Sequence, residues 1–257
     1  MQDYFKGKTI VISGVARGIG KALALEAASY GMQVVGLDLR KEELEELSAE
    51  LLAKSAEFYL EAVDIREEKA CVLFIEKALS RFGSIDMLIN NAGITHIAPE
   101  SKTELRHTKN VMDVNFMGTV HLSHLCLPEI IKNKGTIAGV SSVAGYSPLV
   151  YRTAYAASKH AVWGYFSSLR AELRAKGVQV LTICPSFVST DLQEEQKAYF
   201  KNNTSEALSP AYVSEEIYKA IHQKKDVVLI GKTARRVYFL NRFFPKLYEK
   251  IMLKKMF

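Results

Sequence analysis

The fold is decided by the stretch from Thr9 to Asp38, which reads TIVISGVARGIGKALALEAASYGMQVVGLD. Two short β-branched runs, Thr9–Ser13 and Gln33–Asp38, flank a segment of helical periodicity at Ile19–Tyr30. Both runs are apolar at successive positions, which is typical of strands that are buried on two faces. The stretch therefore predicts a parallel β-α-β unit inside a layered α/β protein.

The alternation of strand and helix patterns continues along the chain. Further strands are expected at Glu57–Val63, Met87–Asn90, Thr136–Val140, Gln179–Ile183 and Val227–Ile230, and further helices at Lys41–Lys54, Glu67–Arg81, Thr103–Ile131, Ala154–Lys176 and Ala211–His222. No Gly/Ser-rich linker and no internal repeat divides the 257 residues. We therefore predict a single α/β domain over residues 1–257, a doubly wound parallel sheet with helices on both faces. Residues 233–257 form a basic C-terminal extension of it.

Composition excludes several classes of protein. With 48% hydrophobic and 24% charged residues, the chain has the profile of a folded globular protein. Ten of its 34 basic residues but only two of its 28 acidic ones lie between Lys224 and Phe257, so this end carries +8 and the rest −2. Because the body is not basic, we expect no nucleic-acid partner. Three scattered cysteines indicate a reducing compartment and no metal site. No apolar run has signal-peptide or membrane-span character, so a cytoplasmic location is expected.

A glycine-rich loop, SGVARGIG at Ser13–Gly20, ends the first strand and leads into a helix. Glycines there allow a tight turn and let backbone N–H groups approach a pyrophosphate at the positive end of the helix. Asp38, 20 residues beyond the central glycine, is placed to bind an adenosine ribose and to repel a 2′-phosphate. This favours NAD over NADP, although Arg17 and Arg40 argue mildly for a phosphate. A plain turn and a solvated acid stay open as alternatives.

A second group of polar residues lies further along, in Ser141–Gly145 and in Tyr155-Ala-Ala-Ser-Lys159. A tyrosine and a lysine four residues apart share one face of a helix. An ammonium beside a phenol stabilises the phenolate, lowers the phenol pKa from about 10 and fits Tyr155 for proton transfer. Ser142 can polarise a carbonyl oxygen. Taken singly, these residues are equally consistent with packing and surface charge.

Taken in order, these motifs resemble the short-chain dehydrogenase/reductase family over nearly the whole chain. The matching elements are Ser13–Gly20, Asp38, Asp64, Asn90–Gly93, Asn115, Ser142, Tyr155 with Lys159, and Pro185 through Thr190. The family interval of 13 residues before Tyr155 selects Ser142 rather than Ser141. Two positions depart from the family pattern, because Ser13 replaces a threonine and Ser186 replaces a glycine.

The resemblance implies a Rossmann fold and an NAD(P)-dependent oxidoreductase that acts on CH–OH groups without a metal. Its implied catalytic residues are Asn115, Ser142, Tyr155 and Lys159. Tyr155 would be the acid/base, Ser142 would orient the substrate oxygen, and Asn115 would kink its helix. The implied cofactor-binding residues are Gly14, Arg17, Gly18, Ile19, Gly20, Asp38, Asp64, Ile65, Asn91, Ala92, Gly93, Tyr155, Lys159, Pro185, Val188 and Thr190.

The expected substrate is an apolar secondary alcohol or ketone, lipid-like or steroid-like. Asp191–Ser209 is the expected substrate loop, with apolar side chains at Tyr199, Phe200 and Leu208. An NADPH-dependent ketoreductase, for example on 3-oxoacyl thioesters, is the alternative enzyme. A non-catalytic nucleotide-sensing scaffold is the alternative from another class, against which the complete set of catalytic residues argues.

Two contacts beyond the site are also expected. Val237, Leu240, Phe244, Leu247 and Ile251 follow one another at helical spacing, among basic residues and with a break at Pro245. This extension is interpreted either as peripheral contact with an anionic membrane or as a terminal helix packed on the protein. The family resemblance further implies a homodimer or homotetramer through the helices that hold Asn115 and Tyr155. On the second helix, the contact residues would be Trp163, Tyr165 and Phe166.

Overall fold

The computed structural model describes residues 1–189 and 207–254. Its seven strands form one parallel sheet in the order β3-β2-β1-β4-β5-β6-β7. The strands are β1 (Thr9–Ser13), β2 (Gln33–Asp38), β3 (Phe58–Ala62), β4 (Met87–Asn90), β5 (Thr136–Val140), β6 (Gln179–Pro185) and β7 (Val227–Ile230). The predicted doubly wound sheet is confirmed. Its order reverses between β1 and β4, which opens a crevice at the carboxyl ends of these two strands.

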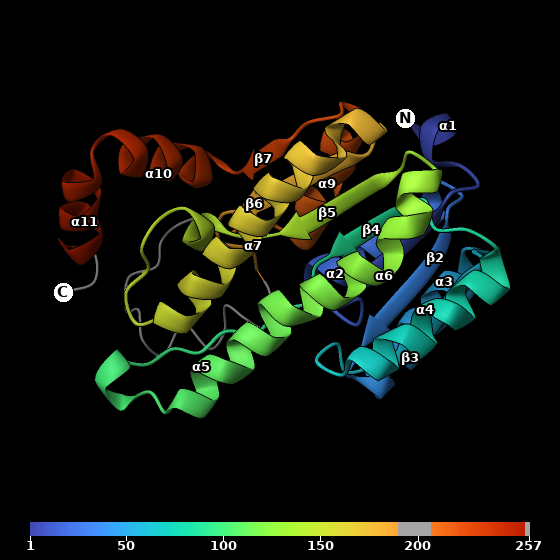
Figure 1. Ribbon diagram of the computed structural model, residues 1–257, viewed down its shortest axis with the longest axis horizontal. Coiled ribbons are helices and arrows are strands. Elements are labelled where there is room, and N and C mark those ends of the chain that lie inside the picture. Colours follow the sequence, from blue (N-terminus) through green and yellow to red (C-terminus); the bar gives the residue numbers. More distant parts are fainter. Residues whose placement is uncertain (190–206, 255–257) are drawn as a thin grey trace.

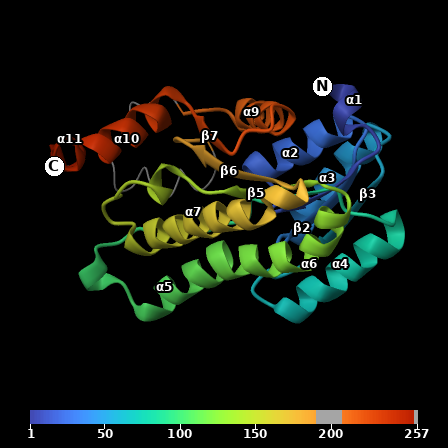
Figure 2. The same ribbon diagram turned by 45° about the horizontal axis from the view of Figure 1, so that its top comes forward.

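Helices cover both faces of the sheet (Figure 1). One face carries the short α1 (Gln2–Phe5) together with α2 (Gly18–Ser29), α3 (Lys41–Ala53) and α9 (Pro210–His222). The other carries α4 (Glu68–Phe82), α6 (Gly118–Lys132) and α7 (Thr153–Leu173). Figure 2 shows α4, α6 and α7 together along one side of the molecule. Short 3₁₀ turns lie at η1 (Glu100–Lys102), η3 (Val143–Gly145) and η4 (Arg174–Lys176).

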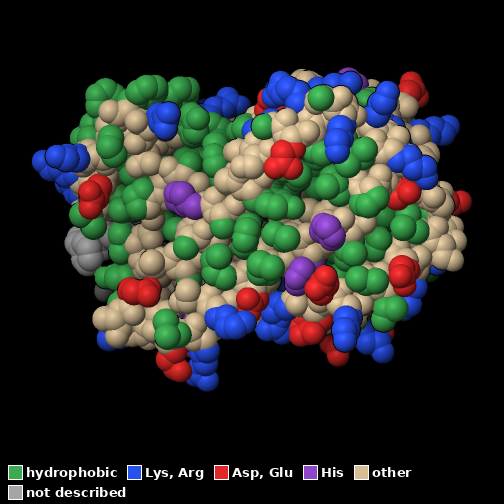
Figure 3. All heavy atoms as spheres, in the orientation of Figure 1, with side chains coloured by type: hydrophobic (Ala, Val, Ile, Leu, Met, Phe, Trp, Pro, Cys, Tyr) green, Lys and Arg blue, Asp and Glu red, His purple; other side chains and the backbone are tan. Residues whose placement is uncertain are grey.

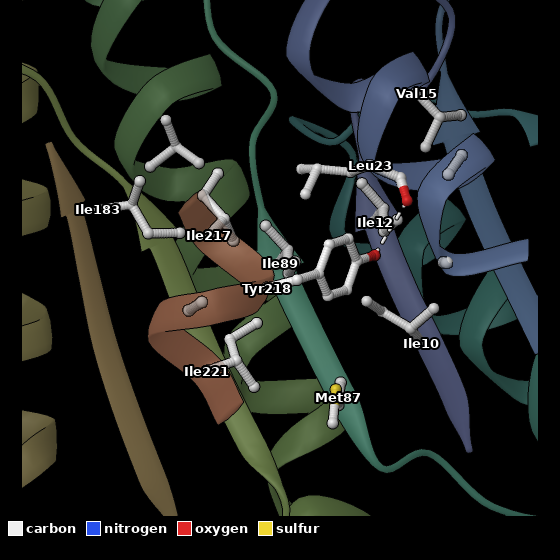
Figure 4. Packing of buried hydrophobic residues seen from close by; sticks show 14 of the residues in the cluster. Ile10, Ile12, Val15, Leu23, Met87, Ile89, Ile183, Ile217, Tyr218 and Ile221 are labelled. Atoms are coloured by element: carbon white, nitrogen blue, oxygen red, sulfur yellow. Dashed lines mark hydrogen bonds between the residues drawn. The ribbon is translucent and has the colours of Figure 1, made fainter. Parts of the chain in front are cut away.

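Each face of the sheet has its own hydrophobic core. Ile10 and Ile12 of β1 belong to the core under α2 and α9, whereas Val11 between them belongs to the opposite one. Figure 4 shows the first core around Tyr218 of α9, whose hydroxyl donates a 2.9 Å hydrogen bond to the carbonyl of Leu23 in α2. Because this phenol is fully buried, the hydrogen bond satisfies its polar end and joins the two helices.

The helix predicted over Thr103–Ile131 is present from Leu105 to Lys132, with a wider turn inside it at Asn115. The structure has α5 (Leu105–Met112), a π-helical turn η2 (Asp113–Met117) and then α6. The wide turn buries Asn115, whose amide donates to the carbonyl of Ile94 (2.9 Å) while its oxygen accepts from the Ile94 N–H (2.8 Å). Hydrogen bonds to a segment 21 residues away stabilise this turn, and such contacts leave no trace in hydrophobic periodicity.

The C-terminal extension forms two helices, α10 (Lys232–Phe243) and α11 (Pro245–Lys254). The predicted break at Pro245 is confirmed, since this residue begins α11, where its missing N–H costs no hydrogen bond. Both helices follow the carboxyl end of β7 and lie at one end of the molecule (Figure 1). Across residues 1–189 and 207–254, no helix is both long and apolar enough to span a membrane.

The aromatic residues expected at a subunit contact are engaged within the chain itself. Phe166 is fully buried against Gly139 of β5, so its assignment to a subunit interface is wrong. Trp163 packs edge-on against Tyr146, with ring centroids 5.6 Å apart. Tyr165 contacts Phe116 in the same edge-to-face way. The reason is that α7 lies directly on the sheet and carries η3 at its other side, so little of its aromatic surface is left for a partner.

Candidate active site

The sheet brings the predicted motifs to one edge. The glycine loop follows β1, Asn91 follows β4, and Ser142 follows β5, and these three strands are neighbours in the sheet. Because the strands are parallel, all three connections leave from the same edge, beside the crevice between β1 and β4. Segments that are separated by up to 130 positions in the chain therefore surround one site.

The backbone of the glycine loop lies very close to itself and to the segment that follows β4. Gly14 and Gly18 have φ of 72° and 56°, in the left-handed region that favours glycine. A Cβ added to Gly20 would lie 1.8 Å from the Gly14 carbonyl oxygen, and one added to Gly14 would lie 2.8 Å from the Cα of Ala92. No side chain caps the first turn of α2, which begins at Gly18 after Arg17. The first turn of α2 thus offers N–H groups that no side chain caps, beside a loop in which backbone segments lie close together. Such a site fits a diphosphate.

Ser13 and Asn91 hold this loop in place. The Ser13 hydroxyl accepts hydrogen bonds from the N–H groups of Asn91 (3.0 Å) and Ala92 (3.1 Å). The Asn91 side-chain amide donates to the carbonyls of Ser13 and Gly14, each at 3.0 Å. Serine therefore supplies the hydroxyl for which the family uses threonine. The side chain of Asn91, one of the implied cofactor-binding residues, therefore supports the backbone of the loop.

Asp38 connects the end of β2 to the glycine loop. Its Oδ2 accepts a hydrogen bond from the Ala16 N–H at 3.1 Å, and its Oδ1 accepts from the N–H groups of Leu39 (2.8 Å) and Arg40 (3.2 Å). The Arg40 guanidinium lies 3.9 Å from Oδ1 and offsets part of its charge. The position predicted for ribose binding is therefore an ordered carboxylate at the rim of the loop.

Asp64 follows β3 as an ionised group. The Nε of Arg66 lies 3.0 Å from both carboxylate oxygens, and the Arg66 backbone N–H adds a third hydrogen bond. The side chain of Arg66 holds the pKa of Asp64 below its ordinary value, chiefly through this hydrogen bonding. The adjacent Ile65 packs against Gly118 at the start of α6. Asp64 can therefore serve as a hydrogen-bond acceptor throughout the neutral pH range.

Tyr155 and Lys159 lie on the buried side of α7, with exposed fractions of 9% and 4%. The Lys159 ammonium donates to the Val140 carbonyl at 2.8 Å and lies 5.8 Å from the centre of the Tyr155 ring. A Cβ added to Gly93 would lie 3.3 Å from this ammonium and 3.2 Å from the Asn115 amide oxygen. The predicted residues Gly93, Asn115, Tyr155 and Lys159 are thus brought together.

The two serines after β5 have different partners. Ser141 donates its hydroxyl hydrogen bond to the backbone carbonyl of Lys159 at 2.9 Å. Ser142 accepts one from the Ala144 N–H at 3.2 Å and hydrogen-bonds the Tyr155 side chain. Ser141 is thus engaged with the backbone of α7, and Ser142 stays the predicted substrate-orienting residue.

Burial dominates the titration of the tyrosine–lysine pair. It raises the pKa of Tyr155 above the ordinary value of 10, while the hydrogen bond with Ser142 and the positive charge of Arg152 act to lower it. Burial also lowers the pKa of Lys159 from 10.5 to about 8. The expected net lowering of the phenol pKa is thus not found, because removing Tyr155 from water outweighs the groups that lower its pKa.

Arg152 is a site residue that sequence reasoning missed. It is only 4% exposed, and its guanidinium carbon lies 5.8 Å from the centre of the Tyr155 ring. Arg152 is the N-cap residue of α7, directly before the first turn of the helix that carries Tyr155 and Lys159. The tyrosine consequently lies between two cationic side chains.

The far side of the site is formed at the end of β6. Pro185 is the last residue of that strand, and Val188 is buried and forms a β-bridge with Leu208. Ser186 is accommodated beside Gly231, whose φ is 96° and where a Cβ would lie 2.5 Å from the serine hydroxyl. The predicted Thr190, Tyr199 and Phe200 lie outside the described residues.

The described residues contain no cluster of His, Cys, Asp and Glu side chains suited to a metal ion. All three cysteines are free and buried.

A doubly wound sheet with a buried tyrosine–lysine pair beside an uncapped glycine loop defines a dinucleotide-dependent oxidoreductase. A family model described as short chain dehydrogenase matches residues 8–199. The chain belongs to this family, whose members are NAD(P)-dependent oxidoreductases acting on CH–OH groups.

Curated relatives match almost the whole chain. Dehydrogenase/reductase SDR family member 7B of Bos taurus is 31% identical over 276 residues, covering 99% of this chain and 83% of the relative. A plant relative, 11-beta-hydroxysteroid dehydrogenase-like 2 of Arabidopsis thaliana, is 28% identical and covers 96% of this chain and 80% of its own.

Two solved structures share the fold. A short chain dehydrogenase/reductase of Burkholderia phymatum in complex with NAD has a TM-score of 0.86 and 26% identity, covering 95% of each chain. A short chain dehydrogenase of Mycobacterium paratuberculosis bound to NAD has a TM-score of 0.79 and 21% identity, covering 87% of this chain and 95% of the other, and it shows likeness of fold alone.

Proposed function

We propose that this protein is an NAD-dependent dehydrogenase that interconverts an apolar secondary alcohol, lipid-like or steroid-like, and its ketone. The observation that carries the proposal is the buried pair of Tyr155 and Lys159 beside Gly93, at the crevice where the glycine loop and Ser142 also lie. The fit to a dinucleotide rests on the uncapped start of α2 and on the close approach of Gly14 and Gly20.

In this proposal Tyr155 moves the proton at the substrate oxygen. Ser142, whose hydrogen bond with Tyr155 acts to lower the phenol pKa, orients that oxygen beside the phenol. The charges of Arg152 and Lys159 stabilise the phenolate that forms when the proton has left. When bound, NAD supplies the acceptor of the two electrons that the alcohol loses.

The choice of NAD over NADP rests on the charge of Asp38. An ordered carboxylate at the rim of the loop accepts hydrogen bonds from ribose hydroxyls and repels a 2′-phosphate. Asp38→Asn removes the charge and keeps a hydrogen-bond acceptor for the Ala16 N–H. We expect kcat/KM with NAD to fall about tenfold and kcat/KM with NADP to rise, so that the preference of the enzyme for NAD over NADP becomes smaller.

Initial rates are measured with NAD and with NADP as the cofactor. Arg40→Ala is the matched control, because it removes the positive charge beside Asp38, and it should increase the preference for NAD. A variant Asp38→Asn that uses NAD as well as the wild type and NADP no better would contradict the assignment. The NADPH-dependent ketoreductase would then be the better description of the enzyme.

The apolar substrate is supported by one relative. The plant protein named as hydroxysteroid dehydrogenase-like is similar over 96% of this chain. Absorbance of reduced nicotinamide, followed with a panel of long-chain, steroid and short alcohols, tests the class. Turnover confined to short polar alcohols would refute it. Turnover that survives Tyr155→Phe would refute the catalytic assignment, and a protein that binds NAD but converts no substrate would be the scaffold.

We also propose that the protein is cytoplasmic and touches an anionic membrane surface through its C-terminal helices. Large apolar side chains lie exposed on α10, on α11 and between them, with Phe239 59% and Phe243 66% exposed, and Phe244, Leu247 and Ile251 also exposed. Figure 3 shows hydrophobic side chains gathered at the end of the molecule where Figure 1 places α10, with Lys and Arg side chains near them. Apolar anchors flanked by cations suit an anionic lipid interface.

Co-sedimentation with vesicles tests this location. The protein should pellet with vesicles of phosphatidylserine and phosphatidylcholine at low salt and should be released as salt screens the charges. The double variant Phe239→Ser, Phe243→Ser should remain in solution. Equal binding of wild type and double variant would contradict the proposal.

We propose, finally, a homodimer or homotetramer that forms through the layer of α5 and α6. Leu105 and Met117 are exposed on this side of the chain and offer apolar contact area. Sedimentation velocity measures the oligomeric state of the protein. A single monomeric species at micromolar concentration would contradict this proposal.

A further inference from the structure

We infer that α10 and α11 position the segment that follows Ser142, so that a lipid surface bound at their outer face acts on the substrate-orienting serine. The inference rests on the proposed function, in which Ser142 has that role, and deepens it by naming what regulates the site. It is carried by the inner face of the two helices, which packs on the active-site segment as well as on β7 at the edge of the sheet.

The first contact is made by Tyr146, four residues after Ser142. Its hydroxyl donates a hydrogen bond to the carbonyl of Ala234 in α10 at 2.8 Å, and its own carbonyl accepts one from the Asn241 side-chain amide at 2.7 Å. Tyr146 is thus held by its side chain and by its backbone from two positions of α10 that lie about two helical turns apart. Both hydrogen bonds join positions about 90 residues apart in the chain.

Aromatic packing extends this contact to the helix that carries Tyr155. The ring of Tyr146 meets that of Tyr238 in α10 edge-on, with centroids 5.2 Å apart, and that of Trp163 in α7 at 5.6 Å. Trp163 and Tyr238 lie 6.2 Å from each other. One ring from the residue that ends η3, one from α7 and one from α10 therefore form a single cluster, and edge-to-face pairs of this kind stabilise the contact beyond the area they bury.

α11 holds the next two residues. Tyr248 is buried, and its hydroxyl lies 3.4 Å from the hydroxyl of Ser147 and 3.3 Å from the carbonyl of Pro148. The segment Tyr146–Pro148 is thus held from α10 at one end and from α11 at the other. We call this set of contacts the clamp.

The clamp reaches Ser142 through the short turn η3. The Gly145 N–H donates to the Ser142 carbonyl at 2.9 Å, the Ser147 N–H donates to the Val143 carbonyl at 3.1 Å, and the Ser142 hydroxyl accepts from Ala144. A turn this short keeps its geometry only when both of its ends are held, because its few internal hydrogen bonds are weak. Tyr146, Asn241 and Tyr248 are therefore positioning residues for Ser142.

Opposite faces of the same helices thus meet two different environments. The inner face carries Ala234 and Tyr248, which are buried, while Phe239, Phe243, Phe244 and Leu247 remain exposed on the outer face. The outer face is flanked by Arg235, Arg236, Arg242, Lys246 and Lys250. Apolar anchors among cations complement an anionic lipid surface, which is the occupant we commit to. A surface that binds only the ordered helices stabilises the clamped conformation by its differential affinity.

Hydrogen exchange at residues 142–148 tests the inference without depending on turnover. Asn241→Ala should speed exchange of the Gly145 and Ser147 amides about fivefold, the change in open population that one lost hydrogen bond of ordinary strength produces. Tyr248→Phe, which keeps the ring and loses only the hydroxyl, should give a smaller effect in the same segment. Phe239→Ser on the outer face is the matched control and should exchange as the wild type does.

A second experiment measures hydrogen exchange and turnover in the presence of vesicles of phosphatidylserine and phosphatidylcholine. The vesicles should slow exchange at 142–148 in the wild type and raise kcat for a water-soluble secondary alcohol, with NADH affinity unchanged. Both effects should be much smaller in Asn241→Ala, which should still bind vesicles, and absent in Phe239→Ser combined with Phe243→Ser.

Two results would overturn the inference. One is exchange at residues 142–148 that is identical in the wild type and Asn241→Ala. The other is bound vesicles that change neither exchange nor turnover of the wild type. If no alcohol is converted at all, the proposed function fails, while the exchange measurements still decide whether the helices hold the segment.

Discussion

Lys159→Met should make the protein more stable while removing its activity. The Lys159 ammonium is buried, and burial lowers its pKa from 10.5 to about 8. A lysine that is charged inside the protein at pH 7 with so low a pKa destabilises the folded state by about 3 kcal/mol relative to the unfolded chain. Methionine has a similar length and no charge, so it removes this cost.

One interaction offsets part of the gain. The Lys159 ammonium donates a 2.8 Å hydrogen bond to the Val140 carbonyl, and Met leaves that carbonyl without this donor. The loss costs about 1 kcal/mol, so the net stabilisation at pH 7 is about 2 kcal/mol. For a chain of this size, this corresponds to a rise in Tm of roughly 4–8 °C.

The stability difference between Lys159→Met and the wild type should depend on pH. Between about pH 8 and 10.5 the unfolded chain keeps the Lys159 proton that the folded protein has released, so the wild type gains stability as pH rises through this range. The advantage of Lys159→Met should therefore shrink from about 2 kcal/mol at pH 7 to near zero at pH 9.5. Taking the difference between variant and wild type cancels titrations that the two proteins share.

Urea unfolding followed by circular dichroism, at pH 7 and pH 9.5 without cofactor, measures the effect, and initial rates measure the loss of turnover. A variant that is equally stable or less stable at pH 7, with an unchanged spectrum, would refute the reasoning about a buried charge. An advantage that does not change with pH would refute the assigned pKa. Gain of stability with loss of function is expected where a site residue is held in a costly environment.

Three further outcomes follow from single contacts. Tyr155→Phe should lower kcat by about a thousandfold, because the proton donor is removed, while NADH affinity measured by fluorescence stays within about twofold. Gly20→Ala places a Cβ 1.8 Å from the Gly14 carbonyl oxygen, so the variant should lose NADH binding or fail to accumulate as folded protein, and full binding would contradict the described loop. Tyr218→Phe should destabilise the protein by about 1 kcal/mol in urea unfolding, since the buried hydrogen bond to Leu23 is lost, with kcat unaffected.

The apolar runs and the glycine spacing were enough to predict the sheet. Strands such as Thr136–Val140 are recognisable because a strand buried on both faces must be apolar along its length. Ser13–Gly20, Asp38 and the interval from Tyr155 to Lys159 indicated the site, because each is a pattern within one turn or one β-α-β unit. These features depend on residues that are near one another in the chain.

The tertiary structure decided what depends on distant neighbours. The wide turn at Asn115 exists because Ile94 bonds its side chain, and the raised pKa of Tyr155 follows from burial that no spacing reveals. The two faces of the C-terminal helices are distinguished only by contacts such as Tyr248 with Ser147, 101 residues apart. Periodicity records which side of a helix is apolar, whereas desolvation and packing depend on what that side meets once the chain has folded.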